Sequence, residues 1–394
     1  MRFPRECYQM HVSIETAFPQ LRPAQQWGLV LWVYGTILAQ SCCQTAVLAA
    51  LLVLGQRQTI RDRLRDWLYD GRDKSAPCRT QVEITTCFAP LLRWLLRLWQ
   101  GQEVALAIDV TNHHDRLHVL CVSVLYRGSA IPVAWHILPG NQPGAWMPHL
   151  CRLLDLLAPA LPPSLTVLVL VDRGLRSPTL WRRITQHGWH PVLRLQQNTV
   201  FRPAGHRHYQ TARELVPRAG EAWLGQGRAF RHQPLAGTLV VVWQEGAAEP
   251  WVLLTDLAPV AVGVVWYGLR VWIELGFRVI KSLGLQWQRT RRLDPDRVAR
   301  HWLVLAVALL WITAYGTRVE DAQTCHLPPA RLHHPPHSQP ARHAPRPVSL
   351  FRLGLAQFRW QLFHGRLWRC LWLAPEPWPG PPLGLAMTYH PAGP

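Results

Sequence analysis

Three carboxylates occupy positions where their side chains could act together on divalent metal ions. Asp109 follows the apolar run VALAI, Asp172 follows the run VLVLV, and Glu274 lies in a later segment with helical spacing. In a mixed sheet whose first and fourth strands are neighbours, Asp109 and Asp172 would lie side by side at one edge, and a following helix could bring Glu274 across them. Carboxylate oxygens are the ligands that Mg2+ prefers, and a pair of such ions suits reactions at phosphate.

Glu274 belongs to a group of polar residues with helical spacing. Tyr267, Arg270, Glu274 and Lys281 are separated by three, four and seven residues. On an α-helix they would fall within an arc of roughly 60°. Apolar residues occupy the adjoining sector, namely Trp266, Leu269, Ile273, Phe277 and Ile280. We therefore expect helix from 262 to 285, anchored by this apolar stripe, with a carboxylate for metal beside donors for phosphate.

These motifs resemble those of a known family. The pattern Tyr-x2-Arg-x3-Glu-x6-Lys in YGLRVWIELGFRVIK (267–281) resembles the signature of bacterial insertion-sequence DDE transposases of the insertion-sequence-four group. The segments AIDVT and VLVDRGL, which contain Asp109 and Asp172, resemble the first and second aspartate motifs of that family. The resemblance covers about residues 100–315.

The resemblance implies an RNase H-like core and cut-and-paste movement of a DNA element. Two divalent metal ions, Mg2+ with Mn2+ as a substitute, would be held by Asp109, Asp172 and Glu274. The side chains that would contact DNA phosphates near the cut are Tyr267, Arg270 and Lys281. The implied partners are double-stranded DNA, both as terminal inverted repeats and as target, and a second copy of the chain in a synaptic homodimer.

Periodicity along the chain predicts the elements that position these residues. Three apolar, β-branched runs between 104 and 138 predict a meander of strands, and the following runs predict the order βββαβαβ. The fold class expected is therefore α/β, an RNase H-like mixed sheet flanked by helices. The predicted organisation is a helical DNA-end-binding domain (1–100), a catalytic core (101–197 and 256–320), a β-rich insertion (198–255) with strands at 238–244 and 251–256, a Pro/His-rich linker (321–347), and a short basic helix with a loose Pro-rich tail (348–394).

Other residues were weighed for the same site. Asp115 is the rival of Asp109, but it lies in the polar turn NHHDR, and Asp256 lacks surrounding donors. A solitary Asp at a strand end is more often a turn or cap residue, so the case depends on the whole set. Histidines near this turn are better explained by turn polarity than by a metal cluster, namely His113, His114 and His118. Trp243 and Trp251 could hold a flipped base, but core packing is the better default, and we leave both out of the site.

Charge and composition favour a polyanionic partner. Lys and Arg number 42 against 23 Asp and Glu, a formal net charge of +19. The nine scattered cysteines show no metal-binding spacing, which indicates a reducing compartment. The resemblance to bacterial transposases implies a cytoplasmic, nucleoid-associated protein. Residues 28–54 carry no charge and are long enough for a membrane span, but polar residues at their centre favour a core helix, as does the shorter run 301–315.

The function expected is metal-dependent cleavage and strand transfer of DNA at the ends of a mobile element. A catalytically decayed or domesticated DNA-binding protein is the first alternative, and retention of the three carboxylates argues against it. A metal-dependent nuclease without strand transfer and a membrane protein are the others.

Overall fold

The computed structural model describes residues 3–74, 80–141, 144–324, 348–368, 370–376 and 387–390. The helices are α1 (Arg5–Ala17), α2 (Pro23–Ala39), α3 (Gln44–Leu51), α4 (Arg57–Leu68), α5 (Phe88–Leu98), α6 (Trp146–Leu157), α7 (Pro178–Gln186), α8 (Ala212–Leu215), α9 (Val271–Arg278), α10 (Pro295–Thr324) and α11 (Leu350–Phe363). The strands are β1 (Glu103–His113), β2 (Leu117–Tyr126), β3 (Ser129–Pro139), β4 (Thr166–Val171), β5 (His190–Arg194), β6 (Val200–Pro203), β7 (Gln210–Thr211), β8 (Ala222–Ala229), β9 (Leu235–Val242), β10 (Trp251–Thr255) and β11 (Met387–His390).

The core sheet has the strand order β3-β2-β1-β4-β5. β1, β2 and β3 form an antiparallel meander, whereas β4 pairs in parallel with both β1 and β5. β4 is an apolar run buried on both faces, as expected for a central parallel strand. The predicted meander and the order βββαβαβ are confirmed, and this mixed sheet flanked by helices is an RNase H-like α/β fold.

The strands of the insertion continue the core sheet. β10 pairs antiparallel with both β5 and β9, and β9, β8 and β6 follow outward. The strands predicted at 238–244 and 251–256 are present as β9 and β10, while β6, β7 and β8 were not predicted. The tail predicted to be loose contains β11, which pairs in parallel with β8. α10 reaches Thr324, so the helix enters the predicted linker, and residues 325–347 lie outside the described residues.

Helices cover both faces of the core sheet. On β3, the indole of Trp135 donates to the carbonyl of Ala299 in α10 at 2.9 Å, whereas the neighbouring His136 stacks on His149 of α6 at 4.0 Å. Because successive side chains of a strand point to opposite faces, α6 and α10 lie on opposite sides of the sheet. α9 also packs against β3. It lies close to α10, where Phe277 of α9 contacts Trp302 of α10 edge-on.

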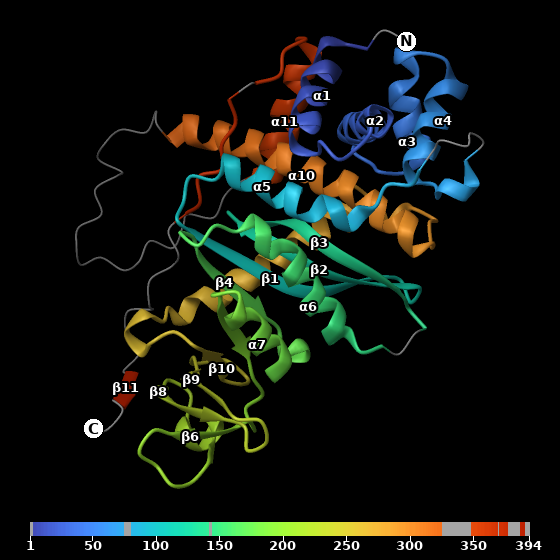
Figure 1. Ribbon diagram of the computed structural model, residues 1–394. Coiled ribbons are helices and arrows are strands. Elements are labelled where there is room, and N and C mark those ends of the chain that lie inside the picture. Colours follow the sequence, from blue (N-terminus) through green and yellow to red (C-terminus); the bar gives the residue numbers. More distant parts are fainter. Residues whose placement is uncertain are drawn as a thin grey trace.

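The N-terminal helices pack on α10, above the core sheet in Figure 1, and the insertion lies at the opposite end. Buried Arg300 of α10 fastens this layer, because its guanidinium donates to Asp70 and to the carbonyl of Leu68, both at 2.6 Å. By length and composition α10 could cross a membrane, but 89% of its apolar window is buried inside the protein. α2 and α3 meet at 92°, so the apolar run 28–54 is a bent helix pair.

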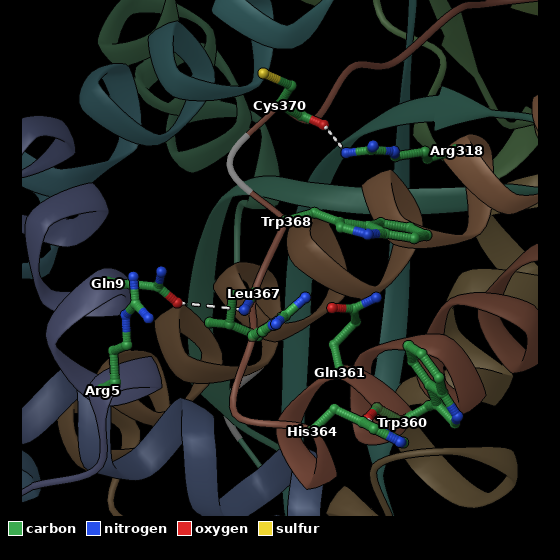
Figure 2. Close-up of a pocket in the computed structure, with 10 residues that line it drawn as sticks. Arg5, Gln9, Arg318, Trp360, Gln361, His364, Leu367, Trp368 and Cys370 are labelled. Atoms are coloured by element: carbon green, nitrogen blue, oxygen red, sulfur yellow. Dashed lines mark hydrogen bonds between the residues drawn. The ribbon is translucent and has the colours of Figure 1, made fainter.

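α1, α11 and the segment that follows α11 contribute to one basic pocket beside α10, which has a volume of about 1010 Å3 (Figure 2). The segment that follows α11 is held there by two hydrogen bonds. Gln9 of α1 accepts from the backbone of Leu367 at 3.3 Å, and Arg318 of α10 donates to the carbonyl of Cys370 at 2.8 Å. None of the three carboxylates predicted to act in catalysis lines this pocket.

Gly276 allows α9 to approach β3 closely. A β-carbon at this position would lie 3.0 Å from both the β-carbon and the carbonyl oxygen of Ala130. We predict that Gly276→Val pushes α9 off the strand and lowers the free energy of unfolding by about 1 to 3 kcal/mol, measured by urea denaturation. The exposed Gly205→Asn, at a positive φ that Asn tolerates, is the control, because nothing lies within 4 Å of a β-carbon there. Equal stability of Gly276→Val and the wild type would contradict the close packing.

Candidate active site

Asp109 and Asp172 lie next to each other on neighbouring parallel strands. The last paired residues of β1 and β4 are Ile108 and Val171, and the two aspartates follow them directly. Asp109 does not end its strand, as the sequence suggested, because β2 continues to pair with β1 as far as His113. The aspartates therefore meet where the parallel pairing stops, which places two carboxylates at one edge.

The carboxylate of Asp109 is mostly buried, with 18% of its side chain exposed. Its Oδ1 accepts from the backbone N–H of Val110 at 2.8 Å, and its Oδ2 accepts from Arg270 at 2.9 Å. Burial raises the pKa of Asp109, and the nearby carboxylates of Asp172 and Glu274 raise it further, which the two hydrogen bonds only partly offset. A positive charge next to the Asp109 carboxylate is therefore strongly stabilising.

The guanidinium of Arg270 supplies this positive charge. Its Nη1 lies 2.9 Å from Asp109, its Nε lies 3.8 Å from Asp172, and its Nη2 donates to Glu274 one turn further along the helix. The Arg270 side chain is 14% exposed, against 50% for Glu274. Carboxylates from two strands and a helix thus converge on one planar cation, which can bond several of them because its donors form a fork.

The segment that carries Arg270 is not the single helix that its periodicity predicted. It begins as a 3-10 helix (Val264–Arg270), continues as α9, and ends in a π-helix (Val279–Leu283). Residues three apart eclipse each other in a 3-10 helix, so Tyr267 and Arg270 point the same way. The wider π-turn then rotates Lys281 away from the line of Glu274.

Tyr267 reaches the site from a buried position. Its hydroxyl donates to Oδ1 of Asp172 at 3.3 Å, and its ring packs edge-on against Trp251 of β10 at 5.7 Å. Burial raises the pKa of Tyr267 well above its ordinary value, so the phenol stays protonated and remains a hydrogen-bond donor. In this arrangement its hydroxyl holds a carboxylate in place.

Lys281 stands apart from the carboxylates in the described structure. No ion pair joins it to them, and its charge instead acts on His113 at the far end of β1. Burial lowers the pKa of the Lys281 ammonium. The structure therefore brings together five of the six predicted site residues and leaves Lys281 beside them, nearer the end of β1.

A second basic group adjoins the site and was not predicted. In the parallel pairing of β4 with β5, Val171 is the partner of Leu193. The next residues along the chain are Asp172, directly after β4, and Arg194 on β5, so these two lie beside each other. Glu249, just before β10, binds both Arg194 at 3.0 Å and Arg173 at 2.9 Å. The strand register was the signal that could have found Arg194, whereas Glu249 comes from the insertion and had no such signal.

The alternatives to the predicted site are engaged elsewhere. Asp115 is exposed in the turn after β1, and Asp256 pairs with His190 at 3.1 Å. His118 lies within hydrogen-bond distance of Asn112 at 2.8 Å, and Trp243 donates to the carbonyl of Ala247 at 2.9 Å. These contacts leave the group around Arg270 as the site best suited to chemistry.

The donor set fits hard divalent cations by type, because it consists of three carboxylates around one charged point. In the described part of the chain, no group of three or more His, Cys, Asp or Glu residues stands close enough to hold a metal ion as it is. The guanidinium of Arg270 lies among the three carboxylates, where a metal ion would otherwise bind. Metal binding at this site would therefore require the guanidinium to move.

The chain was compared with protein-family models, curated proteins and solved structures, and the family model agrees with this chemistry. A family model described as "Transposase DDE domain" matches residues 143–311, a range that includes Asp172, the insertion and the segment of Arg270 and Glu274. No curated protein matches the chain. A solved structure described as the piggyBac transposase synaptic complex with hairpin DNA is similar with a TM-score of 0.42 and 10% identity, over 80% of this chain and 73% of that one. The family match supports a DDE transposase, and the structural likeness is too distant to add to it.

Removal of Arg270 should destabilise the fold in a pH-dependent way. Arg270→Gln leaves Asp109 ionised and without its cation, so we predict a loss of roughly 2 to 3 kcal/mol in the free energy of unfolding at pH 7. The pKa of Asp109, already raised in the wild type, rises further in the variant. The loss in free energy of unfolding is therefore complete at pH values above the pKa of Asp109 in the variant. It shrinks as the pH falls toward 4, because the carboxylate takes up a proton and no longer needs a cation. Urea denaturation at several pH values measures it.

Arg278→Gln is the matched control, because it removes an exposed arginine two turns further along the same segment. Its stability should follow the wild type at every pH. A deficit of Arg270→Gln that stays constant between pH 7 and pH 4 would contradict the role assigned to Arg270.

Proposed function

We propose that this chain is a DDE transposase that cleaves and joins DNA at the ends of a mobile element. The observation that carries the proposal is the convergence of Asp109, Asp172 and Glu274, from two strands and a helix, on one cation. The family match over residues 143–311 supports the same class of enzyme. The finer assignment, to the insertion-sequence-four group, depends on the spacing of Tyr267, Arg270, Glu274 and Lys281.

Asp109, Asp172 and Glu274 are the residues that would hold two divalent metal ions, Mg2+ or Mn2+. When bound, such ions polarise the scissile phosphate and generate the attacking oxygen nucleophile. Buried Asp109 fixes the deepest ligand position, through its bond with the N–H of Val110. Half-exposed Glu274 lies on the outer side, where it can change partners with little cost in burial.

The cationic and phenolic residues act on substrate and on the carboxylates. Arg270 balances the carboxylate charge in the absence of metal and is then free to bind a DNA phosphate once other cations take its place. Tyr267 orients Asp172 through its hydrogen bond of 3.3 Å, and its buried ring lets the hydroxyl do so without moving. Lys281 is the remaining donor for phosphate, toward the end of β1.

The proposed partners are double-stranded DNA and a second copy of the chain. A net charge of +19 suits binding to a polyanion. The DNA would be bound both at the ends of the mobile element and at the target site. Cleavage of two ends together would need a homodimeric synaptic complex in the bacterial cytoplasm. A decayed DNA-binding protein and a nuclease without strand transfer are the rivals, and both would share the charge.

The test is cleavage and joining of duplexes that carry the flanking ends of the chain's own gene, with Mg2+ or Mn2+. We predict that Glu274→Gln, which keeps the shape but removes the charge, lowers the cleavage rate about a hundredfold or more, because a metal ligand is lost. Glu103→Gln is the control, since Glu103 is an exposed carboxylate on the same strand as Asp109.

Each outcome separates the proposed function from a rival. Equal cleavage by the wild type and Glu274→Gln would refute the site. DNA binding without cleavage by the wild type would support the decayed protein, and cleavage without joining would support a nuclease.

A further inference from the structure

A second charged pocket lies where the segment after the π-helix enters α10. It has a volume of about 660 Å3 and is formed by the junction of α2 with α3, the connector 289–294 and the first turns of α10. Its basic residues are Arg289, Arg291, Arg292 and Arg297, and Asp294 is the acidic residue that lines it. The Asp294 carboxylate is occupied, because it caps α10 by accepting from the backbone N–H of Arg297 at 2.9 Å.

The arginines of this pocket are only partly neutralised. Arg297 binds Asp73 at 2.8 Å and lies over the ring of Tyr69. Arg292 has no carboxylate in hydrogen-bond or ion-pair contact within the described chain, and its contact is with the amide oxygen of Gln44 at 3.4 Å. Burial lowers the pKa of this guanidinium and Arg297 lowers it further, which Tyr69, Cys42 and Asp294 only partly offset. Arg291 is exposed at the rim.

Buried polar atoms without partners also belong to this pocket. The Nε atoms of Arg292 and Arg297 are buried and have no hydrogen-bond partner in the described residues. His301 also lines the pocket with 1% of its surface exposed, and burial lowers its pKa to about 3, so the imidazole is neutral. Orphaned buried donors are rare in folded proteins, so these two in one pocket indicate a place built for an acceptor-rich ligand.

The pocket is linked to the active site through β1. His113, at the end of that strand, lies with its Nε2 at 3.1 Å from the carbonyl oxygen of Thr290, in the wall of the pocket. Asp109 and His113 are four residues apart, so they share one face of the strand and are separated by roughly 13 Å. The charge of Lys281 also acts on His113.

We propose that this arginine pocket binds a backbone phosphate of the DNA, on the side of the reacting phosphate toward which β1 runs past Asp109. A phosphodiester supplies the charge that Arg291 and Arg292 lack and the oxygen acceptors that the buried donors lack. This inference rests on the proposed function, and it assigns a contact that positions the duplex without reading its sequence.

The first test measures DNA binding without divalent metal, in EDTA, over a range of salt concentrations. Each arginine that neutralises a phosphate contributes about one unit to the slope of log K against log salt. We predict that Arg291→Gln and Arg292→Gln each reduce this slope, by up to about one unit, on any duplex sequence. Arg152→Gln is the control, because this exposed arginine lies on α6, across the sheet from α10, and its slope should equal that of the wild type.

The second test locates the phosphate with duplexes that carry one neutral methylphosphonate at successive positions. The wild type should bind less tightly when one particular phosphate near the cut is neutral, and Arg291→Gln should be insensitive to that same change. Unchanged salt slopes in both arginine variants would overturn the inference, as would equal sensitivity of the wild type and Arg291→Gln at every position. These measurements need no cleavage. Failure of the pocket proposal can therefore be distinguished from failure of the proposed transposase function.

Arg291 is exposed, so its replacement leaves the buried part of the pocket intact. Thermal unfolding of each variant establishes that a change in slope reflects lost contact with DNA. A slope change in Arg292→Gln alone, accompanied by partial unfolding, would count against the inference.

Discussion

The organisation of this site depends on the neutralisation of three converging carboxylates by one guanidinium. Asp109 is buried enough to have a raised pKa, and Asp172 and Glu274 add repulsion to it. Without a cation among them these side chains would protonate or move apart, because like charges at short range are costly in a medium of low polarity. Arg270 supplies that cation from within the chain and keeps the carboxylates together.

The fold provides the geometry that this charge balance needs. Parallel pairing of β1 with β4 sets the two aspartates level with each other. The change from 3-10 helix to α-helix aims Tyr267, Arg270 and Glu274 at the same point, and Gly276 lets this segment lie close against β3. The same strand β1 then carries His113 to the wall of the arginine pocket. One strand and one helical segment thus position both the carboxylates and the wall of the arginine pocket.

Much of this architecture could be predicted from local patterns in the sequence. Apolar runs identified the meander and β4, and residue types and spacing identified the carboxylates and Arg270. The π-turn that separates Lys281 from Glu274 could not be predicted, because the residues VIKSL fit an α-helix equally well and packing decides. The contacts of Arg194 and Glu249 depend on how the insertion joins the sheet through β10, which is a long-range pairing without a local signal.

The central claim is that Arg270 occupies, in the absence of metal, the charge position that divalent cations take during catalysis. Calorimetric titration of Mn2+ into the wild type, Arg270→Gln and Asp109→Asn tests it most directly, with folding verified by thermal unfolding. The account predicts that Arg270→Gln binds Mn2+ about tenfold more tightly than the wild type, a difference of about 1.4 kcal/mol, because the competing cation is gone. It also predicts that Asp109→Asn loses binding. Equal or weaker Mn2+ affinity in Arg270→Gln would contradict the account.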